Sequence, residues 1–187
     1  MLTVCSHNRT RSVMMAAMIE SMLTDRLGAG STLVRSSGFG PEGIPAIDDA
    51  VDAMRRRGLD VSAHRSRSTT AALVDGADVI ITAERAHVVK IAALSPSAFT
   101  RAMTLPEFLD RVADAPLGQT PTSVRDWVAS LTDDRTAGAY LREPVPEVAD
   151  PTGTMPRAFE AAVVAIERQC TSVSDTLARV ARDVVAD

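Results

Sequence analysis

Residues 1–12, MLTVCSHNRTRS, place a cysteine and an arginine between a short apolar strand and a helix. Residues 1–4 predict a strand that ends at Cys5, and the apolar spacing from Met14 to Leu23 predicts a helix that begins just after Arg11. A strand, a tight loop and a helix in this order direct backbone N–H groups and a helix N-terminus at one point, where an anion is favoured. The same positive field favours the thiolate form of Cys5, and Arg11 supplies paired donors for phosphate oxygens. The stretch therefore predicts a thiolate that faces a bound tetrahedral oxyanion.

The rest of the chain alternates short apolar strands with amphipathic helices. Further strands are expected at residues 32–35, 77–82 and 102–105, and further helices at residues 47–57, 84–94, from 106 onward, and 157–180. Residues 115–150 are expected to be less regular, with a short helix near residues 126–128. The alternation predicts an α/β fold with a mostly parallel sheet. Ligands bind such sheets at the carboxyl ends of the strands, so we expect Cys5, Ser37 and Thr82 to meet at one site.

Composition limits the possible classes of protein. The chain has 187 residues, 45% of them hydrophobic, and a formal net charge of -4, which predicts a single domain over residues 1–187 and argues against nucleic-acid binding. No run of residues has the length of a membrane span, and no membrane partner is expected. The two cysteines, Cys5 and Cys170, lack metal-ligand spacing, so neither a disulfide scaffold nor a metal site is expected. A reduced, cytoplasmic setting follows.

Five features in order resemble the low-molecular-weight protein tyrosine phosphatase family. They are the loop at residues 5–12, Ser-Gly at 37–38, the stretch GLDVSAHRSR at 58–67, the strand ADVIIT at 77–82 and Asp-Pro at 150–151. The resemblance implies a three-layer α/β sandwich, with a four-stranded parallel sheet flanked by helices on both faces. It also implies phosphomonoester hydrolysis, with protein phosphotyrosine as the foremost substrate and with no cofactor or metal.

The resemblance also assigns roles to individual residues. Cys5 would be the nucleophile, Arg11 the phosphate clamp and Asp150 the general acid and base. The phosphate-binding loop would further comprise Ser6, His7, Asn8, Arg9, Thr10 and Ser12, and it would be supported by Ser37 and His64. The chemistry agrees with these roles, because a thiolate attack on phosphorus gives a cysteinyl-phosphate and a nearby carboxylic acid protonates the leaving oxygen.

The chain departs from the family pattern at several positions. His7 stands where the family has glycine, which places a side chain where unusual torsions are tolerated. Val13 replaces a proline, and Thr10 replaces a neighbouring cysteine that many members use for a protective disulfide. Arg9 stands where a small or apolar residue touches the substrate, and it either favours a more anionic substrate or points to solvent. Thr152 follows Asp150-Pro151 where aromatic residues often wall the substrate ring.

Alternatives remain open at this level. Trp127 or Tyr140 could line the cleft in place of the missing aromatic residues. A small-molecule thiol could couple Cys5 to arsenate reduction on the same fold, and the chain could also be a phosphate-binding regulatory module with weak turnover. Expected partners are a phosphorylated protein or a small phosphomonoester, and the oligomeric state is left open.

Overall fold

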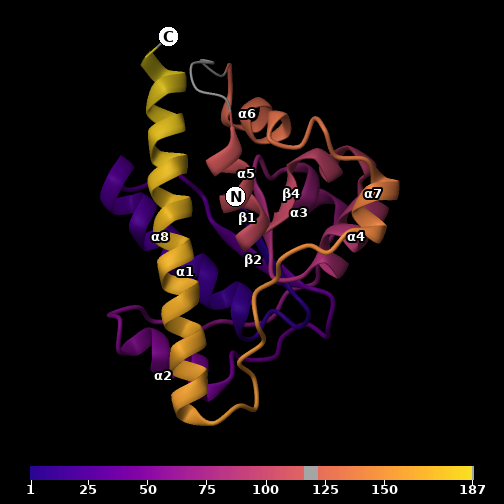
Figure 1. Ribbon diagram of the computed structural model, residues 1–187. Coiled ribbons are helices and arrows are strands. Elements are labelled where there is room, and N and C mark those ends of the chain that lie inside the picture. The colour runs from indigo at the N-terminus through magenta and orange to yellow at the C-terminus, as the bar shows by residue number, and fades with distance from the viewer. Residues whose placement is uncertain (116–121, 187) are drawn as a thin grey trace.

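In the computed structural model, which describes residues 1–115 and 122–186, a parallel sheet lies between two layers of helices (Figure 1). Its strands, in the order β2-β1-β3-β4, are β1 (Leu2–Cys5), β2 (Arg35–Gly38), β3 (Ile80–Thr82) and β4 (Ala102–Thr104). One layer contains α1 (Arg11–Leu27), α2 (Asp48–Arg55), α5 (Leu105–Asp114), α6 (Val124–Ser130) and α8 (Pro156–Ala186). The other contains α3 (Ala71–Asp75), α4 (Arg85–Leu94), the 3-10 helix η1 (Pro96–Arg101) and α7 (Ala137–Arg142). The predicted three-layer α/β sandwich is confirmed.

Alternate residues of each strand pack into the two layers. Leu2 and Val4 of β1 belong to the core beneath α3 and α4, whereas Cys5 belongs to the core shared with α1 and α8. Ile80 and Ile81 of β3 divide between the two cores in the same way. Successive side chains of a strand point to opposite faces, so a sheet covered on both sides needs apolar residues at consecutive positions.

The carboxyl ends of the strands lie at one edge of the sheet. Cys5 pairs with Gly38 across β1 and β2, and Thr82 pairs with Thr104 across β3 and β4. All four strands are parallel, so the connections that follow them also emerge at this edge. Ser37 and Thr82 both lie opposite Val4, one residue before Cys5, so the three residues lie toward this edge of the sheet.

The position of the second strand was predicted wrongly. Residues 32–35 were expected to form it, but β2 spans Arg35–Gly38, and Leu33 is 61% exposed before it begins. The ladder runs from Leu2 opposite Arg35 to Cys5 opposite Gly38. The strand thus continues through small polar residues because pairing with β1, rather than local apolar content, determines which residues join the sheet.

The helices follow the sequence pattern more closely. α1, α4, α5 and α6 form where they were expected, and α2 ends before Gly58, whose φ of 74° suits a helix C-terminus. α8 is longer than residues 157–180, because it begins at Pro156 and continues to Ala186. α3, η1 and α7 were not predicted, and α6 and α7 add order to the segment expected to be irregular. Residues 116–121, which belong to the segment expected to be irregular, lie outside the described residues.

Gly38 lets β2 pass directly beneath the Cys5 loop. A Cβ atom at this position would lie 2.6 Å from the Asn8 nitrogen and 2.9 Å from both the Cys5 oxygen and the His7 carbonyl carbon. All three are backbone atoms of the loop, so a rotamer change cannot relieve the contact. Glycine is therefore required by the distance between strand and loop.

We expect Gly38→Ala to lower the free energy of unfolding by about 1–3 kcal/mol, because the added methyl overpacks the loop backbone. Chemical denaturation measures this change, and phosphate titration measures the accompanying loss of anion binding. Gly138→Ala is the matched control, since its Cβ would approach only the Arg142 side chain at 3.5 Å and alanine favours the helix. Equal stability of Gly38→Ala and wild type would contradict the steric argument.

Candidate active site

The loop between β1 and α1 presents a run of free backbone donors. Among the described residues, no protein acceptor receives the backbone N–H groups of residues 6–11. Cys5 lies at the end of β1 with 3% of its surface exposed, and α1 begins at Arg11. Consecutive N–H groups at a helix start form a concave site for an anion, so the loop has the geometry that residues 1–12 predicted.

Asn8 holds the loop in this shape. Its φ of 53° is left-handed, a conformation that asparagine tolerates better than most residues. The Asn8 side-chain oxygen accepts the Arg67 N–H at 2.9 Å, and its carbonyl accepts from His64 Nε2 at 2.8 Å. Because a carbonyl only accepts, His64 carries its proton on Nε2. The pKa of His64 is lowered, mainly because the ring is partly buried. Asn8 and His64 thus support the loop from below.

A chain of donors ends at the cysteine sulfur. Asn8 Nδ2 donates to Ser12 Oγ at 3.0 Å, and Ser12 Oγ lies 3.0 Å from Cys5 Sγ. With one acceptor position of the hydroxyl occupied by Asn8, the Ser12 proton is free to be donated to Cys5 Sγ. A hydroxyl donor stabilises negative charge on sulfur, so this arrangement favours the nucleophilic form of Cys5.

Arg11 binds acceptors from two distant segments of the chain. Its Nη1 donates to the Val148 carbonyl at 3.0 Å, and its Nη2 lies 2.9 Å from Asp150 Oδ2 and 2.6 Å from Glu84 Oε1. The guanidinium is buried, whereas the Asp150 side chain is 49% exposed. Arg11 and Asp150, which are 139 positions apart in the sequence, are therefore in direct contact.

The segment 144–150, here called the strap, carries Asp150 across the carboxyl edge of the sheet. The Val148 N–H donates to the Ala83 carbonyl at 2.8 Å, next to the end of β3. Just beyond the strap, Thr152 Oγ1 donates to Thr10 Oγ1 at 3.2 Å. Thr10 thus ties the loop to the segment that bears Asp150.

Ser37 supports the strand end rather than the loop itself. Its hydroxyl lies 2.8 Å from Thr69 Oγ1, which in turn donates to the Gly38 carbonyl at 2.9 Å. The Thr69 proton is used by Gly38, so Ser37 is the donor of the pair. Its contribution is to keep the end of β2 in place beneath the loop.

The unusual loop residues are accommodated without backbone strain. Among the described non-glycine residues, positive φ occurs at Asn8 and not at His7. The His7 ring is exposed and lies over Gly40, where a Cβ would come within 2.8 Å of His7 Cδ2. Arg9 Nε donates to the Pro45 carbonyl at 2.8 Å, so this guanidinium bends toward the neighbouring loop.

Sequence reasoning missed Glu84 and His87. Glu84 binds Arg11, and His87 is 2% exposed with its Nε2 3.1 Å from Ser6 Oγ. Their position after β3 could have indicated both residues, because polar residues that follow the carboxyl end of a strand lie at the ligand-binding edge of a parallel sheet.

The two aromatic candidates for lining the cleft are engaged elsewhere. The Tyr140 hydroxyl donates to Glu107 Oε2 at 3.0 Å in the core beneath α4. Trp127 packs edge-on against Phe108, with ring centroids 6.1 Å apart. Neither side chain contributes a wall to the Cys5 loop.

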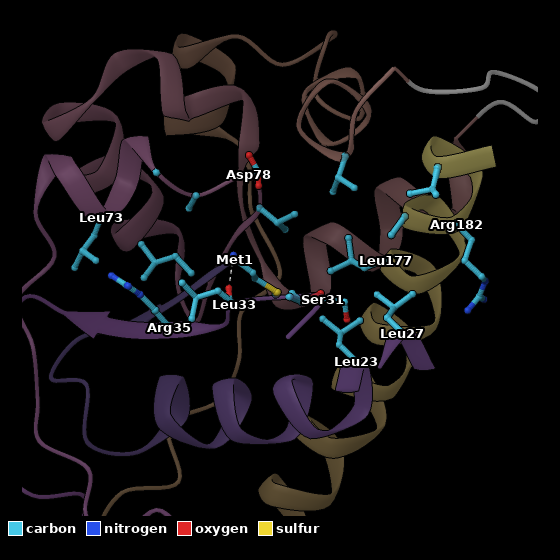
Figure 2. Close-up of a pocket in the computed structure, with 18 of the residues that line it drawn as sticks. Met1, Leu23, Leu27, Ser31, Leu33, Arg35, Leu73, Asp78, Leu177 and Arg182 are labelled. Atoms are coloured by element: carbon cyan, nitrogen blue, oxygen red, sulfur yellow. Dashed lines mark hydrogen bonds between the residues drawn. The ribbon is translucent and has the colours of Figure 1, made fainter. Parts of the chain in front are cut away.

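A separate cavity lies at the other edge of the sheet (Figure 2). Its volume is about 770 Å³, and it is lined by Leu23 and Leu27 of α1, Leu177 of α8 and residues at the amino ends of β1 and β2. The lining is mainly apolar and contains no cysteine or histidine. The cavity offers Asp78 but no cysteine nucleophile, whereas Cys5, Arg11 and Asp150 belong to the loop and its contacts, so we place the candidate active site at the Cys5 loop.

Two further properties concern residues 1–115 and 122–186. In that part of the chain, no cluster of three or more His, Cys, Asp and Glu side chains is placed to hold a metal ion. None of the helices described there is long and apolar enough to span a membrane.

Comparison with known proteins relates this site to one family. The family model for "Low molecular weight phosphotyrosine protein phosphatase" matches residues 1–119. A curated relative from Ralstonia solanacearum, the "Probable low molecular weight protein-tyrosine-phosphatase EpsP", is 36% identical over 97 residues, or 51% of this chain. A relative of the same name from Ralstonia nicotianae is 34% identical over 97 residues. The match spans 63% of the length of each of these curated relatives.

Solved structures share the fold over more of the chain. The arginine phosphatase YwlE from Geobacillus stearothermophilus superposes with a TM-score of 0.68 at 23% identity, covering 94% of this chain and 90% of that one. The tyrosine phosphatase Wzb from Escherichia coli K30, in complex with sulphate, has a TM-score of 0.66 at 20% identity, covering 94% and 96%. Because these identities are low, the likeness concerns the fold.

We expect Ser12→Ala to slow the alkylation of Cys5 by iodoacetamide at pH 6 about 10- to 100-fold, because negative charge on Sγ loses a hydroxyl donor. Ser12→Thr retains the hydroxyl and should react at nearly the wild-type rate. The rates are measured by mass spectrometry, which separates Cys5 from Cys170, and an unchanged rate in Ser12→Ala would show that the contact does not stabilise the thiolate.

Proposed function

This chain belongs to the low molecular weight phosphotyrosine protein phosphatase family, and from that premise we propose that it hydrolyses phosphomonoesters through a phosphocysteine on Cys5. One observation supports the proposal above the others. Cys5 Sγ lies at the base of a loop of free N–H donors, beside an arginine that is bound to a carboxylate from the far end of the chain. These contacts support the assignment of Cys5 as the nucleophile, Arg11 as the phosphate clamp and Asp150 as the acid.

Substrate binding begins with Arg11 in this proposal. A phosphate dianion accepts the loop N–H groups and the Arg11 guanidinium, which favours paired contacts with phosphate oxygens. Arg11 Nη2 binds Asp150 at 2.9 Å and Glu84 at 2.6 Å, so a phosphate competes with these carboxylates for the same donor. The entering phosphate takes this donor, and Asp150 is left facing the leaving group.

The chemistry then proceeds in two steps. The Cys5 thiolate attacks phosphorus in line, which forms the S–P bond as the bond to the leaving oxygen breaks, and Asp150 donates a proton to that oxygen. In the second step Asp150 accepts a proton from water, which attacks phosphorus, releases inorganic phosphate and restores the thiolate. The loop N–H groups and Arg11 stabilise charge on the equatorial oxygens in both steps.

The substrate we propose is a phosphorylated protein, with phosphotyrosine foremost, or a small phosphomonoester. We propose that the reaction requires no metal or cofactor, and that the catalytic unit is one cytoplasmic domain spanning residues 1–187. Ser6 and His7 of the loop and Thr152 beside it are polar, so we propose that the phosphate rather than an aromatic cage supplies most of the recognition.

Arsenate reduction is less well supported than hydrolysis. Cys170 is fully buried within α8, and burial raises the pKa of its thiol, so it is not placed to relay a disulfide from Cys5. Only a small-molecule thiol could then complete that reaction, and Asp150 would have no role in it. A regulatory module without turnover would bind phosphate through the same loop but would not hydrolyse esters.

We expect Cys5→Ser to abolish hydrolysis of p-nitrophenyl phosphate, because the hydroxyl is not ionised near pH 6. Asp150→Asn should lower kcat about 10²–10⁴-fold for alkyl phosphates, whose leaving oxygen needs a proton, and less for p-nitrophenyl phosphate. Steady-state assays between about pH 5 and 7, with and without vanadate, measure both effects.

Asp175→Asn is the control for Asp150→Asn, since it neutralises an exposed carboxylate of α8 that binds Arg26. It should leave both substrates unaffected. If Asp150→Asn lowered kcat equally for substrates with good and with poor leaving groups, Asp150 would not be the general acid. Wild-type protein that binds vanadate without any turnover would favour the regulatory alternative.

A further inference from the structure

His87 occupies a fixed tautomer next to the loop. Its Nδ1 accepts the Glu84 backbone N–H at 3.2 Å, and Nε2 lies 3.1 Å from Ser6 Oγ. A ring nitrogen that accepts an N–H is unprotonated, so the proton of the neutral imidazole is on Nε2. His87 therefore donates to Ser6, and the Ser6 oxygen is the acceptor.

The ring is held neutral by its surroundings. It is 2% exposed and stacks on Phe39, with ring centroids 5.9 Å apart and an interplanar angle of 14°. Burial is the largest cause that lowers the pKa of His87 to about 4, with contributions from Arg11, Lys90 and His7, while Glu84 acts in the opposite direction. Because its pKa is lowered, His87 is a neutral donor near neutral pH.

This tautomer excludes a serine nucleophile. Ser6, His87 and Glu84 contain the residue types of a catalytic triad, but a base would have to accept the serine proton, and here Nε2 already carries one. The Glu84 carboxylate binds Arg11 at 2.6 Å, and it is the Glu84 backbone N–H that contacts His87 Nδ1. Glu84 and His87 therefore act to orient the Ser6 hydroxyl.

The Ser6 proton has no protein acceptor among the described residues. Its hydroxyl oxygen receives His87 Nε2–H, and the Ser6 carbonyl accepts the Phe39 N–H at 2.8 Å, which fixes the residue on both sides. Ser6 directly follows Cys5 and is half-buried at the mouth of the loop. Its proton is thus available to a ligand at the residue that follows the nucleophile in the loop.

We propose that Ser6 is a catalytic hydrogen-bond donor to the phosphoryl group at Cys5, and that His87 is the positioning residue that directs the Ser6 proton toward it. The proposal rests on the proposed phosphatase function. An oriented hydroxyl contributes most where charge develops on the phosphoryl oxygens, so it binds the transition state more tightly than the ground state.

The test compares Ser6→Ala, Ser6→Thr, His87→Gln and His87→Ala. Ser6→Ala should lower kcat/KM for p-nitrophenyl phosphate about 10- to 100-fold, while Ser6→Thr retains the hydroxyl and stays within about threefold of wild type. His87→Gln should also stay close to wild type, because an amide N–H can replace Nε2–H. The Ser6→Ala/His87→Ala double variant should lose no more than Ser6→Ala alone, as expected for residues that act together.

Vanadate and phosphate titrations separate this role from a structural one. Ser6→Ala should weaken the binding of vanadate, a transition-state mimic, about 10- to 100-fold. It should weaken the binding of phosphate about threefold or less. Ser95→Ala is the control, since it removes a hydroxyl that donates to Asp75 at 2.6 Å at the other end of α4. It should change thermal stability without changing either affinity.

The outcomes distinguish this proposal from the proposed function. Active wild-type protein with an unchanged Ser6→Ala variant overturns the role of Ser6 and leaves the phosphatase intact. Equal weakening of vanadate and phosphate also overturns it, because a structural defect would act on both. If wild type shows no turnover, the phosphatase proposal fails, and the difference between the vanadate and phosphate affinities still decides whether Ser6 is a donor.

Discussion

The Arg11 guanidinium holds the carboxyl edge of the sheet together. It is buried, and a buried charge without partners would cost several kcal/mol, so its acceptors have to be in place when the protein folds. Those acceptors come from the turn after β3, through Glu84, and from the strap, through Val148 and Asp150. One side chain thereby links the start of α1, the end of β3 and the segment before α8.

The loop around Cys5 depends on contacts that leave its N–H groups free. Asn8 is bound through its side chain and its carbonyl, and the loop backbone lies directly on Gly38. These contacts hold the loop while the N–H groups of residues 6–11 are without a backbone acceptor among the described residues. A site organised before the anion arrives avoids the cost of ordering the loop on binding. His87 completes this shell through Ser6.

Sequence reasoning predicted most of the fold because its signals are local. The apolar strand before Cys5 and the helix after Arg11 need only neighbouring residues, and the same holds for α4 and α5. It misplaced β2, where pairing with β1 overrides local hydrophobicity. It also missed His87: the position of this residue after β3 pointed to the ligand-binding edge, but its contact with Ser6 joins residues 81 positions apart.

The sequence by itself determined the alternation of the four strands with the main helices, and it placed Cys5 and Arg11 between the first strand and the first helix, because periodicity and turn chemistry act over a few residues. Only the tertiary structure decided that Asp150 meets Arg11, that Glu84 shares the guanidinium, and that His87 donates to Ser6. These contacts depend on how parallel strands bring their carboxyl ends to one edge and on where the strap crosses them. Contacts between residues so far apart in the sequence follow from the packing of the whole chain, and no local sequence pattern encodes them.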